Sequence, residues 1–201
     1  MIFFSLAEFV DTFGARMSCT DNLNNATDYM LAALRSAGLE NVHTENASVP
    51  DWDRGLETAE LLLPHKQRFS ILGLGSSIGT PRGGIEADVI AVDSFDEFDR
   101  LPETSVRGKI VLFVPVWESY GKTVAYRRDA ASVASRKGAV AALIRSITPF
   151  SIGTPHTGSQ YYQEGVQKIP VAALTVEDAE MLLRIHRRGI LTLIKNDLHR
   201  L

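Results

Sequence analysis

The chain has 201 residues, which suits one ordinary domain or one domain with an appendage, and 21 Lys and Arg against 24 Asp and Glu leave a formal charge of −3. This near-balance excludes the strong positive field of a nucleic-acid-binding protein, so no nucleic-acid partner is expected. A 45% hydrophobic and 22% charged composition is that of a folded chain, and no apolar run approaches the roughly 20 residues that cross a bilayer.

A single cysteine, Cys19, permits no internal disulfide and no zinc site built from clustered cysteines. It has no neighbouring histidine, which favours a buried or incidental thiol over a nucleophile. Asn25 and Asn46 begin Asn-x-Ser/Thr sequons and are candidate N-glycosylation sites if the chain enters the secretory pathway. The first residues, MIFFSLAEFV, lack a basic leader and a small-residue cleavage site, so they predict a helix rather than a signal peptide, with the true N-terminus outside this sequence.

Two helices are predicted near the N-terminus. The first covers residues 5–13, and the second begins after an N-cap at Asp21 and stops at Gly38. Apolar residues at spacings of three and four give the second helix one apolar face, formed by Leu23, Ala26, Met30, Leu34 and Ala37. An edge strand is expected over residues 41–49, and a turn-rich hinge follows at 50–55.

Strand signals dominate the chain after residue 57. Short β-type runs separated by Pro, Gly and Asp occupy residues 60–63, 68–74, 87–92 and 109–114. A helix is predicted over residues 124–137, where Gly138 ends it, and its small side chains would let it lie close to a sheet. The continuous apolar run 139–147 then predicts a strand buried on both faces.

A second strand–helix unit begins with the apolar residues 169–174. Thr175 and Asp178 form a capping box in which Asp replaces the usual Glu, so a helix is predicted over residues 176–188. Gly189 ends that helix, and a last strand is expected at 190–194. The pattern predicts a mixed α/β fold in which antiparallel strands precede strand–helix–strand units.

No convincing catalytic constellation is present in the residues themselves. The glycine-rich segment 73–81 has Gly-x-Gly-x-x-x-Gly spacing and runs into Pro81, which favours a tight backbone crossing or β-bulge over lining of a partner site, and excludes a nucleotide loop. The five histidines lie outside the local patterns that place two ligands on one metal, so neither metal ligands nor catalytic residues are assigned. His186, in the basic end of the last helix, is expected on the surface.

The loop around His156 is a stronger candidate for recognition. It reads Thr-Pro-His-Thr-Gly, lies between the two strand–helix units and precedes Gln160 and two tyrosines. Loops carried by a rigid scaffold often hold binding residues. A hydrogen-bonded loop histidine without a catalytic partner is the alternative interpretation.

Seven stretches resemble the N-terminal part of the carboxypeptidase Q (plasma glutamate carboxypeptidase) family, which belongs to the zinc aminopeptidase and transferrin-receptor superfamily. They are VDTFGARMS (10–18), ILGLGSSIGTP (71–81), SFDEFDR (94–100), RGKIVLF (107–113), ALIRSI (142–147), PHTG (155–158) and KIPVAALTVEDAEML (168–182). Their spread over nearly the whole chain makes the resemblance specific.

The resemblance implies a division of the chain. Residues 1–57 would be the first helices and strand of an incomplete peptidase domain. Residues 58–197 would form an inserted protease-associated domain, a β-sandwich or barrel-like module with flanking helices, and 198–201 a truncated tail. Family members hold two zinc ions through a His-x-Asp, a Glu-Glu pair, a further Asp and a final His, all beyond the inserted domain. No zinc is therefore expected on this chain alone.

Two functional hypotheses follow. In the first, the chain is part of a secreted or lysosomal, homodimeric zinc exopeptidase that hydrolyses dipeptides or short peptides with free termini, and is not catalytic alone. Two loops are then candidates for a place at the substrate cleft, through Ser76 and Ser77 on one and His156 and Thr157 on the other. In the second, it is a non-catalytic module that binds a peptide or protein partner. In both, residues 1–50 are expected to be loosely packed in isolation, because their apolar face lacks most of its core.

Overall fold

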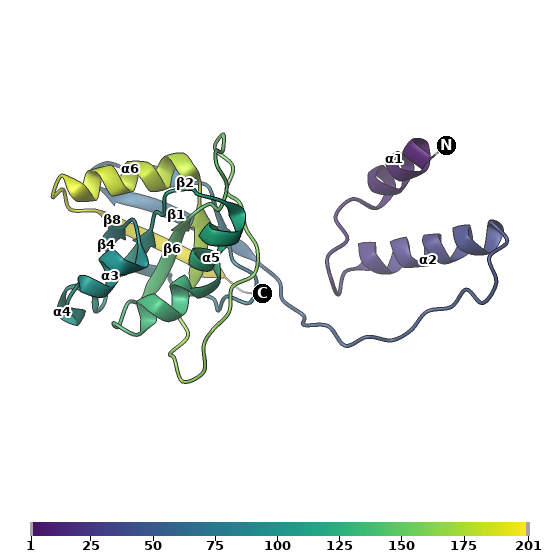
Figure 1. The fold of residues 1–201 in the computed structure, drawn as a ribbon, viewed down its shortest axis with the longest axis horizontal. Helices are drawn as coiled ribbons and strands as arrows, with labels where there is room; N and C mark the ends of the chain where they lie inside the picture. Colours follow the sequence, from purple (N-terminus) through teal and green to yellow (C-terminus); the bar gives the residue numbers. More distant parts are fainter. Residues whose placement is uncertain (1, 200–201) are drawn as a thin grey trace. The chain divides into compact units, whose positions relative to one another are not determined.

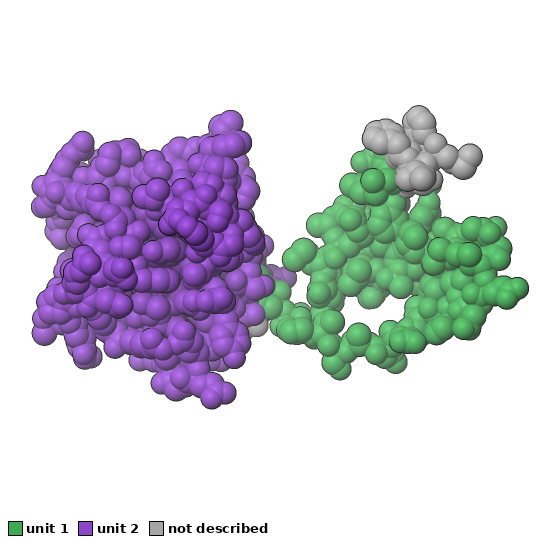
Figure 2. Space-filling view, in the orientation of Figure 1, with its two compact units in different colours: residues 1–52 green, residues 53–201 purple. Residues whose placement is uncertain are grey.

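The computed structural model describes residues 2–199 and divides the chain into two compact units, Met1–Trp52 and Asp53–Leu201. The two units are coloured separately in Figure 2. The division falls inside the predicted hinge at residues 50–55. The finer domain boundary predicted between residues 57 and 58 stays a prediction.

The N-terminal unit is built on two helices, α1 (Ile2–Phe13) and α2 (Asp21–Ser36), which confirms both predicted helices. Aromatic side chains join them, because the Phe13 ring centroid lies 5.3 Å from that of Phe9 and 5.3 Å from that of Tyr29. Ala26 is buried on α2, whereas Met30 and Leu34 are exposed. The unit therefore has a small core, and part of its apolar face is uncovered.

Two details of this unit differ from the predictions, and a third narrows one of them. The N-cap of α2 is Thr20, whose hydroxyl accepts a hydrogen bond from the Leu23 N–H at 3.3 Å, so Asp21 is the first helical residue. Residues 41–49 form no strand, because they pair with no strand that would supply the hydrogen bonds of a ladder. Cys19 is exposed, so of the two predicted possibilities, a buried or an incidental thiol, the buried one is excluded.

The second unit is built on one eight-stranded sheet with the order β2-β1-β8-β4-β5-β6-β7-β3. Its strands are β1 (Leu56–Leu63), β2 (Gln67–Phe69), β3 (Ile71–Gly73), β4 (Ile85–Val92), β5 (Ile110–Phe113), β6 (Ala141–Arg145), β7 (Val171–Leu174) and β8 (Leu193–His199). Strands β4 to β7 run parallel in sequence order, and the other pairs are antiparallel. The predicted mixed α/β, barrel-like architecture is confirmed, because β1, next to one end of this order, approaches β3 at the other end.

The last strand is displaced from its predicted position at residues 190–194. In β8, Ile194, Asn196 and Leu198 are buried, whereas the intervening Lys195 and Asp197 are not. This is the period-two alternation of a strand with one face in the core. It was missed because polar residues occupy both faces, including the buried Asn196.

Four helices belong to the second unit: α3 (Phe95–Arg100), α4 (Glu103–Val106), α5 (Tyr120–Ser135) and α6 (Val176–Arg187). The helices predicted at 124–137 and 176–188 are confirmed as α5 and α6, which flank the strands in Figure 1. The capping box is also confirmed, because the Thr175 hydroxyl accepts the Asp178 N–H at 3.0 Å and donates to the Asp178 carboxylate at 2.9 Å. The short α3 and α4 were not predicted.

Two hydrophobic clusters hold these layers together. One includes the α6 side chains of Ala179 and Leu182 with residues from most strands. The other joins β4 to β7 with Phe98 of α3 and with small residues of α5 such as Ala130 and Ala134. Because alanines occupy this face of α5, the helix lies close to the sheet, as its composition predicted.

Candidate functional site

The carboxyl ends of the four parallel strands lie at one edge of the sheet. Asp93 follows β4, residues 114–119 follow β5, residues 146–150 follow β6, and Thr175 follows β7. In open α/β sheets, ligands bind in the crevice outside these ends. A groove of about 490 Å³ lies here, which is within the size range of small-molecule sites.

Strand ends, helix α6 and the loop after β5 form the groove. Its lining residues are Asp93, Val114, Pro115, Val116, Trp117, Arg145, Pro149, Glu180, Leu183 and Arg187. The α6 members are spaced three and four residues apart, so they form one stripe of the helix. The groove thus combines two carboxylates and two guanidinium groups with apolar walls.

The Asp93 carboxylate forms an ion pair with Arg187, and Glu97 lies 3.9 Å from the same guanidinium. Burial acts to raise the pKa of Asp93, but hydrogen bonds from Arg187 and Ser94 outweigh it, so the pKa is lowered from its ordinary value. Asp93 is therefore ionised at neutral pH and paired at one end of the groove.

Arg145 is the most buried charged residue of the groove, with 5% of its side chain exposed. Its Nη1 atom donates to the carbonyl oxygens of Ser146 at 3.2 Å and Thr148 at 3.0 Å. Its Nε atom donates to the Glu180 carboxylate at 3.3 Å. These bonds hold the guanidinium rigidly at the end of β6.

A smaller hollow of about 260 Å³ adjoins the groove on the α5 side. It shares Asp93, Pro115 and Val116 with the groove and extends to Lys122 and Tyr126. Val116, which lines both hollows, has 78% of its surface exposed. The loop after β5 therefore separates two parts of one concave surface.

The segments that carry the predicted candidate residues, 73–77 and 156–160, contact each other. The Thr157 hydroxyl donates to the Gly73 carbonyl at 3.0 Å, and the Gln160 amide donates to the Ser76 carbonyl at 3.1 Å. The His156 backbone N–H donates to the Ser146 hydroxyl at 2.7 Å, which ties this loop to the end of β6. Both Ser76 and His156 are exposed.

Ser77 differs from Ser76 because it is only 4% exposed. Its hydroxyl accepts the Val171 N–H at 2.9 Å and donates to the Ile78 carbonyl at 2.9 Å. The predicted tight backbone crossing is present at the same segment, since the Gly75 N–H donates to the Gly158 carbonyl at 2.8 Å. The Ser77 hydroxyl is thus engaged in fixing the fold.

Arg127 of α5 holds the His156 loop from the other side. It is 9% exposed, donates from Nη1 to the Thr157 carbonyl at 3.2 Å and also hydrogen-bonds the Tyr120 hydroxyl. Gly158 lies so close that an added Cβ atom would be 2.6 Å from Arg127 Cζ. A side chain at residue 158 would therefore have to displace the guanidinium that covers the loop backbone.

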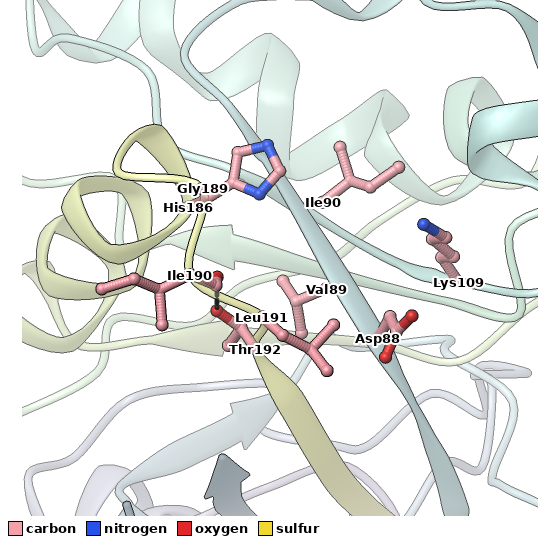
Figure 3. A pocket seen from close by; sticks show the side chains of 9 residues that line it. All are labelled: Asp88, Val89, Ile90, Lys109, His186, Gly189, Ile190, Leu191 and Thr192. Carbon is pink, nitrogen blue, oxygen red and sulfur yellow. Dashed lines mark hydrogen bonds between the residues drawn. The ribbon is translucent and has the colours of Figure 1, made fainter. Parts of the chain in front are cut away.

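A separate pocket of about 230 Å³ lies where α6 leads into β8 (Figure 3). The His186 ring lies on one side of it, and Asp88 and Lys109 lie on the other. His186, predicted on the surface, is half-buried and lines this pocket. Burial lowers the pKa of its imidazole from the ordinary value; Glu97 opposes this shift, and Lys109 and Arg187 add to it.

The residues described, 2–199, contain no group of three or more His, Cys, Asp or Glu side chains arranged to hold a metal ion. The acidic groups of the groove do not fit a zinc site either, since Asp93 and Glu180 are paired with arginines. Within the same residues, no helix has the length and apolar character needed to span a bilayer.

The fold and the sequence together define a class of domain. Residues 78–182, just over half of the chain, match the family described as "PA domain". The chain therefore belongs to the PA domain family. The matched segment runs from β4 to α6 and includes every residue of the groove except those at the end of α6.

The resemblance to carboxypeptidase Q is confirmed. The chain is 51% identical over 184 residues to mouse carboxypeptidase Q and 50% identical over 190 residues to the human protein. These alignments cover 92% and 94% of this chain, but 39% and 40% of the relatives. The chain thus spans about two fifths of the length of these relatives.

Solved structures support the same relationship. A peptidase M28 precursor from Shewanella amazonensis superposes with a TM-score of 0.89 at 31% identity, covering 97% of this chain and 46% of that one. A zinc aminopeptidase from Bacillus subtilis has a TM-score of 0.70 at 17% identity over 98% of this chain and 43% of that one, which supports the fold alone.

Sequence reasoning found the contacting loops but missed the groove. Its four charged residues, Asp93, Arg145, Glu180 and Arg187, come from three separate parts of the sequence and belong to no local motif. One signal was available: Asp93 directly follows the predicted run 87–92, and Arg145 lies near the end of the predicted run 139–147, and polar residues at the carboxyl ends of strands often form binding sites. Glu180 and Arg187 required knowledge of how α6 packs.

Proposed function

We propose that the chain is the PA-domain-containing region of a carboxypeptidase Q-like zinc metallopeptidase that hydrolyses dipeptides or short peptides with free termini. The observation that carries the proposal is the identity of about 50% to carboxypeptidase Q over more than nine tenths of the chain. The superposition with a peptidase M28 precursor at 31% identity supports it independently.

In this proposal the chain contributes shape and recognition rather than the reacting groups. The zinc ions that such enzymes use would activate water and polarise the scissile carbonyl, and their ligands would come from the part of the relatives that this chain does not cover. The groove and the contacting loops would cover the cleft and select short substrates. We also propose the division into a peptidase portion, 1–57, and a protease-associated domain, 58–197.

Hydrolysis assays on two chains test the proposal. The 201-residue chain supplied with Zn²⁺ is expected to hydrolyse no dipeptide and to bind no stoichiometric zinc. A chain extended to the full length of the relatives is expected to release both amino acids from a dipeptide in a zinc-dependent reaction. Zinc-dependent hydrolysis by the 201-residue chain itself, or none by the extended chain, would contradict the proposal.

Within that extended enzyme, Ser76, Ser77, His156 and Thr157 are proposed to belong to loops at the substrate cleft. His156 gives the clearest test, because its side chain is exposed and only its backbone is used by the fold. H156A is expected to raise KM more than it lowers kcat, with thermal stability unchanged. If both constants stay as in the parent enzyme, His156 has no role in the cleft.

A secreted or lysosomal location, glycosylation and a homodimer are further parts of the proposal. Asn25 and Asn46 are both exposed, as glycan acceptors must be. Expression in a secretory host, followed by glycosidase treatment and mass measurement, is expected to remove one or two glycans. N25Q and N46Q variants identify which asparagine carries each of them.

The alternative function is a non-catalytic module that binds a peptide or protein partner. The observation in its favour is the exposure of large apolar side chains on loops around the groove, with Val116 at 78%, Phe150 at 73% and Ile152 at 89% exposed. The sequence that follows residue 201 in the transcript discriminates between the two functions. A peptidase continuation with metal-ligand motifs favours the first, and an unrelated continuation favours the second.

A further inference from the structure

One arginine of the groove has unused hydrogen-bonding capacity. The Nε and Nη1 atoms of Arg145 have acceptors, whereas no acceptor for Nη2 is present among residues 2–199. Nη2 is not among the side-chain atoms that are both fully buried and without a partner, so this atom is partly exposed. Because Arg145 lines the groove, the small exposed part of its side chain opens into that space.

The position of this guanidinium is fixed in advance. Nη1 is held by the Ser146 and Thr148 carbonyls and Nε by Glu180. The Arg145 side chain would therefore lose little conformational freedom when a ligand binds. The N–H groups of Nη2 remain for a ligand, and a hydrogen bond from an arginine to a carboxylate is stronger than one between neutral groups. A desolvated, immobilised arginine is therefore a good receptor for a single negative charge.

The surroundings restrict the charge of the ligand. Asp93 and Glu180 balance Arg187 and Arg145, so the groove as a whole carries no excess positive charge. A doubly charged phosphate would be repelled by the two carboxylates, whereas a carboxylate needs one arginine only. The apolar neighbours Trp117, Leu183 and Val114 would accommodate an aliphatic group attached to that carboxylate.

We propose that the groove beside Arg145 binds the free C-terminal carboxylate of a short peptide whose last side chain is apolar. This inference rests on the proposed function, because it assigns a recognition site for one free terminus of a peptide substrate. The carboxylate would accept hydrogen bonds from Arg145 Nη2, and the last side chain would lie between Trp117 and Leu183. Glu180 would compete with the ligand for the same guanidinium.

The test is a binding titration of the isotope-labelled 201-residue chain by amide NMR. The probes are acetyl-Ala-Leu with a free carboxylate, the corresponding C-terminal amide, and acetyl-Ala-Glu-amide, which carries its carboxylate on a side chain. Only the first is expected to shift the amides of Val116, Trp117, Ser146 and Thr148 at low millimolar concentration or below. Equal binding of the amide, or shifts confined to other regions, would overturn the inference.

Two variants locate the interaction. R145Q is expected to weaken binding of the free acid by about tenfold or more, since hydrogen bonds between charged groups are among the stronger ones. R184Q, which removes an exposed arginine of the same helix, α6, from outside the groove lining, is the matched control and should leave binding unchanged. Equal loss in both variants would show a general charge effect and reject the site.

A third variant guards against loss of folding in R145Q. E180Q leaves Arg145 in place and removes the competing carboxylate, so it should tighten binding of the free acid severalfold and leave the amide unaffected. An unchanged affinity for the free acid would reject the role of Arg145. All these experiments measure binding and not activity. If the chain binds the carboxylate but an extended chain has no peptidase activity, the proposed function is rejected and the binding site is retained.

Discussion

The Glu57 carboxylate accepts a hydrogen bond from the Gly73 N–H at 2.8 Å and thereby joins β1, next to one end of the sheet order, to β3 at the other end. Arg54 reinforces the junction, because its Nε atom donates to the Gly73 carbonyl at 3.2 Å and lies 3.7 Å from the Glu57 carboxylate. The barrel-like sheet is therefore closed here by side chains instead of a strand ladder.

Removing the carboxylate should open this junction. Only 8% of the Glu57 side chain is exposed, so E57A would leave the Gly73 N–H without its acceptor in a largely enclosed place. We expect the free energy of unfolding to fall by about 1–3 kcal/mol, the usual cost of a buried unsatisfied group. Urea denaturation measures it, with E60A on the same strand as the control, for which a change of less than half that of E57A is expected.

The same contact explains why residue 73 is glycine. A Cβ atom at this position would collide with the Glu57 carboxylate. G73A should therefore destabilise the protein, and the penalty should be smaller in an E57A background, where the collision is relieved. A double-mutant cycle from denaturant unfolding measures this coupling. Additive effects of the two substitutions would show that the two residues do not act together.

Two glycine substitutions, one expected to lower the stability and one expected to raise it, test whether Arg127 holds the His156 loop in place. In G158A the new methyl group would press on Arg127, and we expect a loss of about 1–3 kcal/mol of stability, as for other overpacked sites. Gly121, within α5, has open space around it. G121A should instead stabilise the protein through helix propensity, by less than the roughly 0.5–1 kcal/mol of a helix interior because Gly121 lies in the first turn. Thermal unfolding of both variants measures these changes in stability. An unchanged stability of G158A would show that Arg127 does not hold the loop in place.

These predictions also show where sequence reasoning succeeds. The buried runs β5, β6 and β7, the capping box at Thr175 and the glycine crossing near Gly75 are local patterns, and the structure confirms them. The Glu57–Gly73 junction and the pairing of Arg145 with Glu180 join residues that are distant in sequence. Their chemistry depends on how strands and helices pack, which no local pattern encodes.

Stability should depend on pH through His186. Because burial lowers its pKa in the folded state below the unfolded value of roughly 6.5, the unfolded chain binds more protons in this range. The free energy of unfolding should therefore be highest above that value and fall as pH decreases through it. H186Q should flatten this decrease between about pH 7 and pH 5, measured by urea unfolding at each pH. An identical pH profile in the variant would assign the decrease to other groups.

The N-terminal unit should open more easily than the second one. Its apolar side chains are largely uncovered, with Leu6 59%, Val10 43% and Met30 41% exposed, whereas β5 to β7 are buried throughout. Few buried contacts mean a low free energy of local opening, so amide hydrogens of α1 and α2 should exchange much faster than those of the central strands. Hydrogen exchange followed by mass spectrometry measures both units in one sample. Equal protection of α2 and β6 would contradict this prediction and would mean that the apolar face of the helix pair is covered in solution. If self-association covers it, dilution of the sample should restore fast exchange in α2.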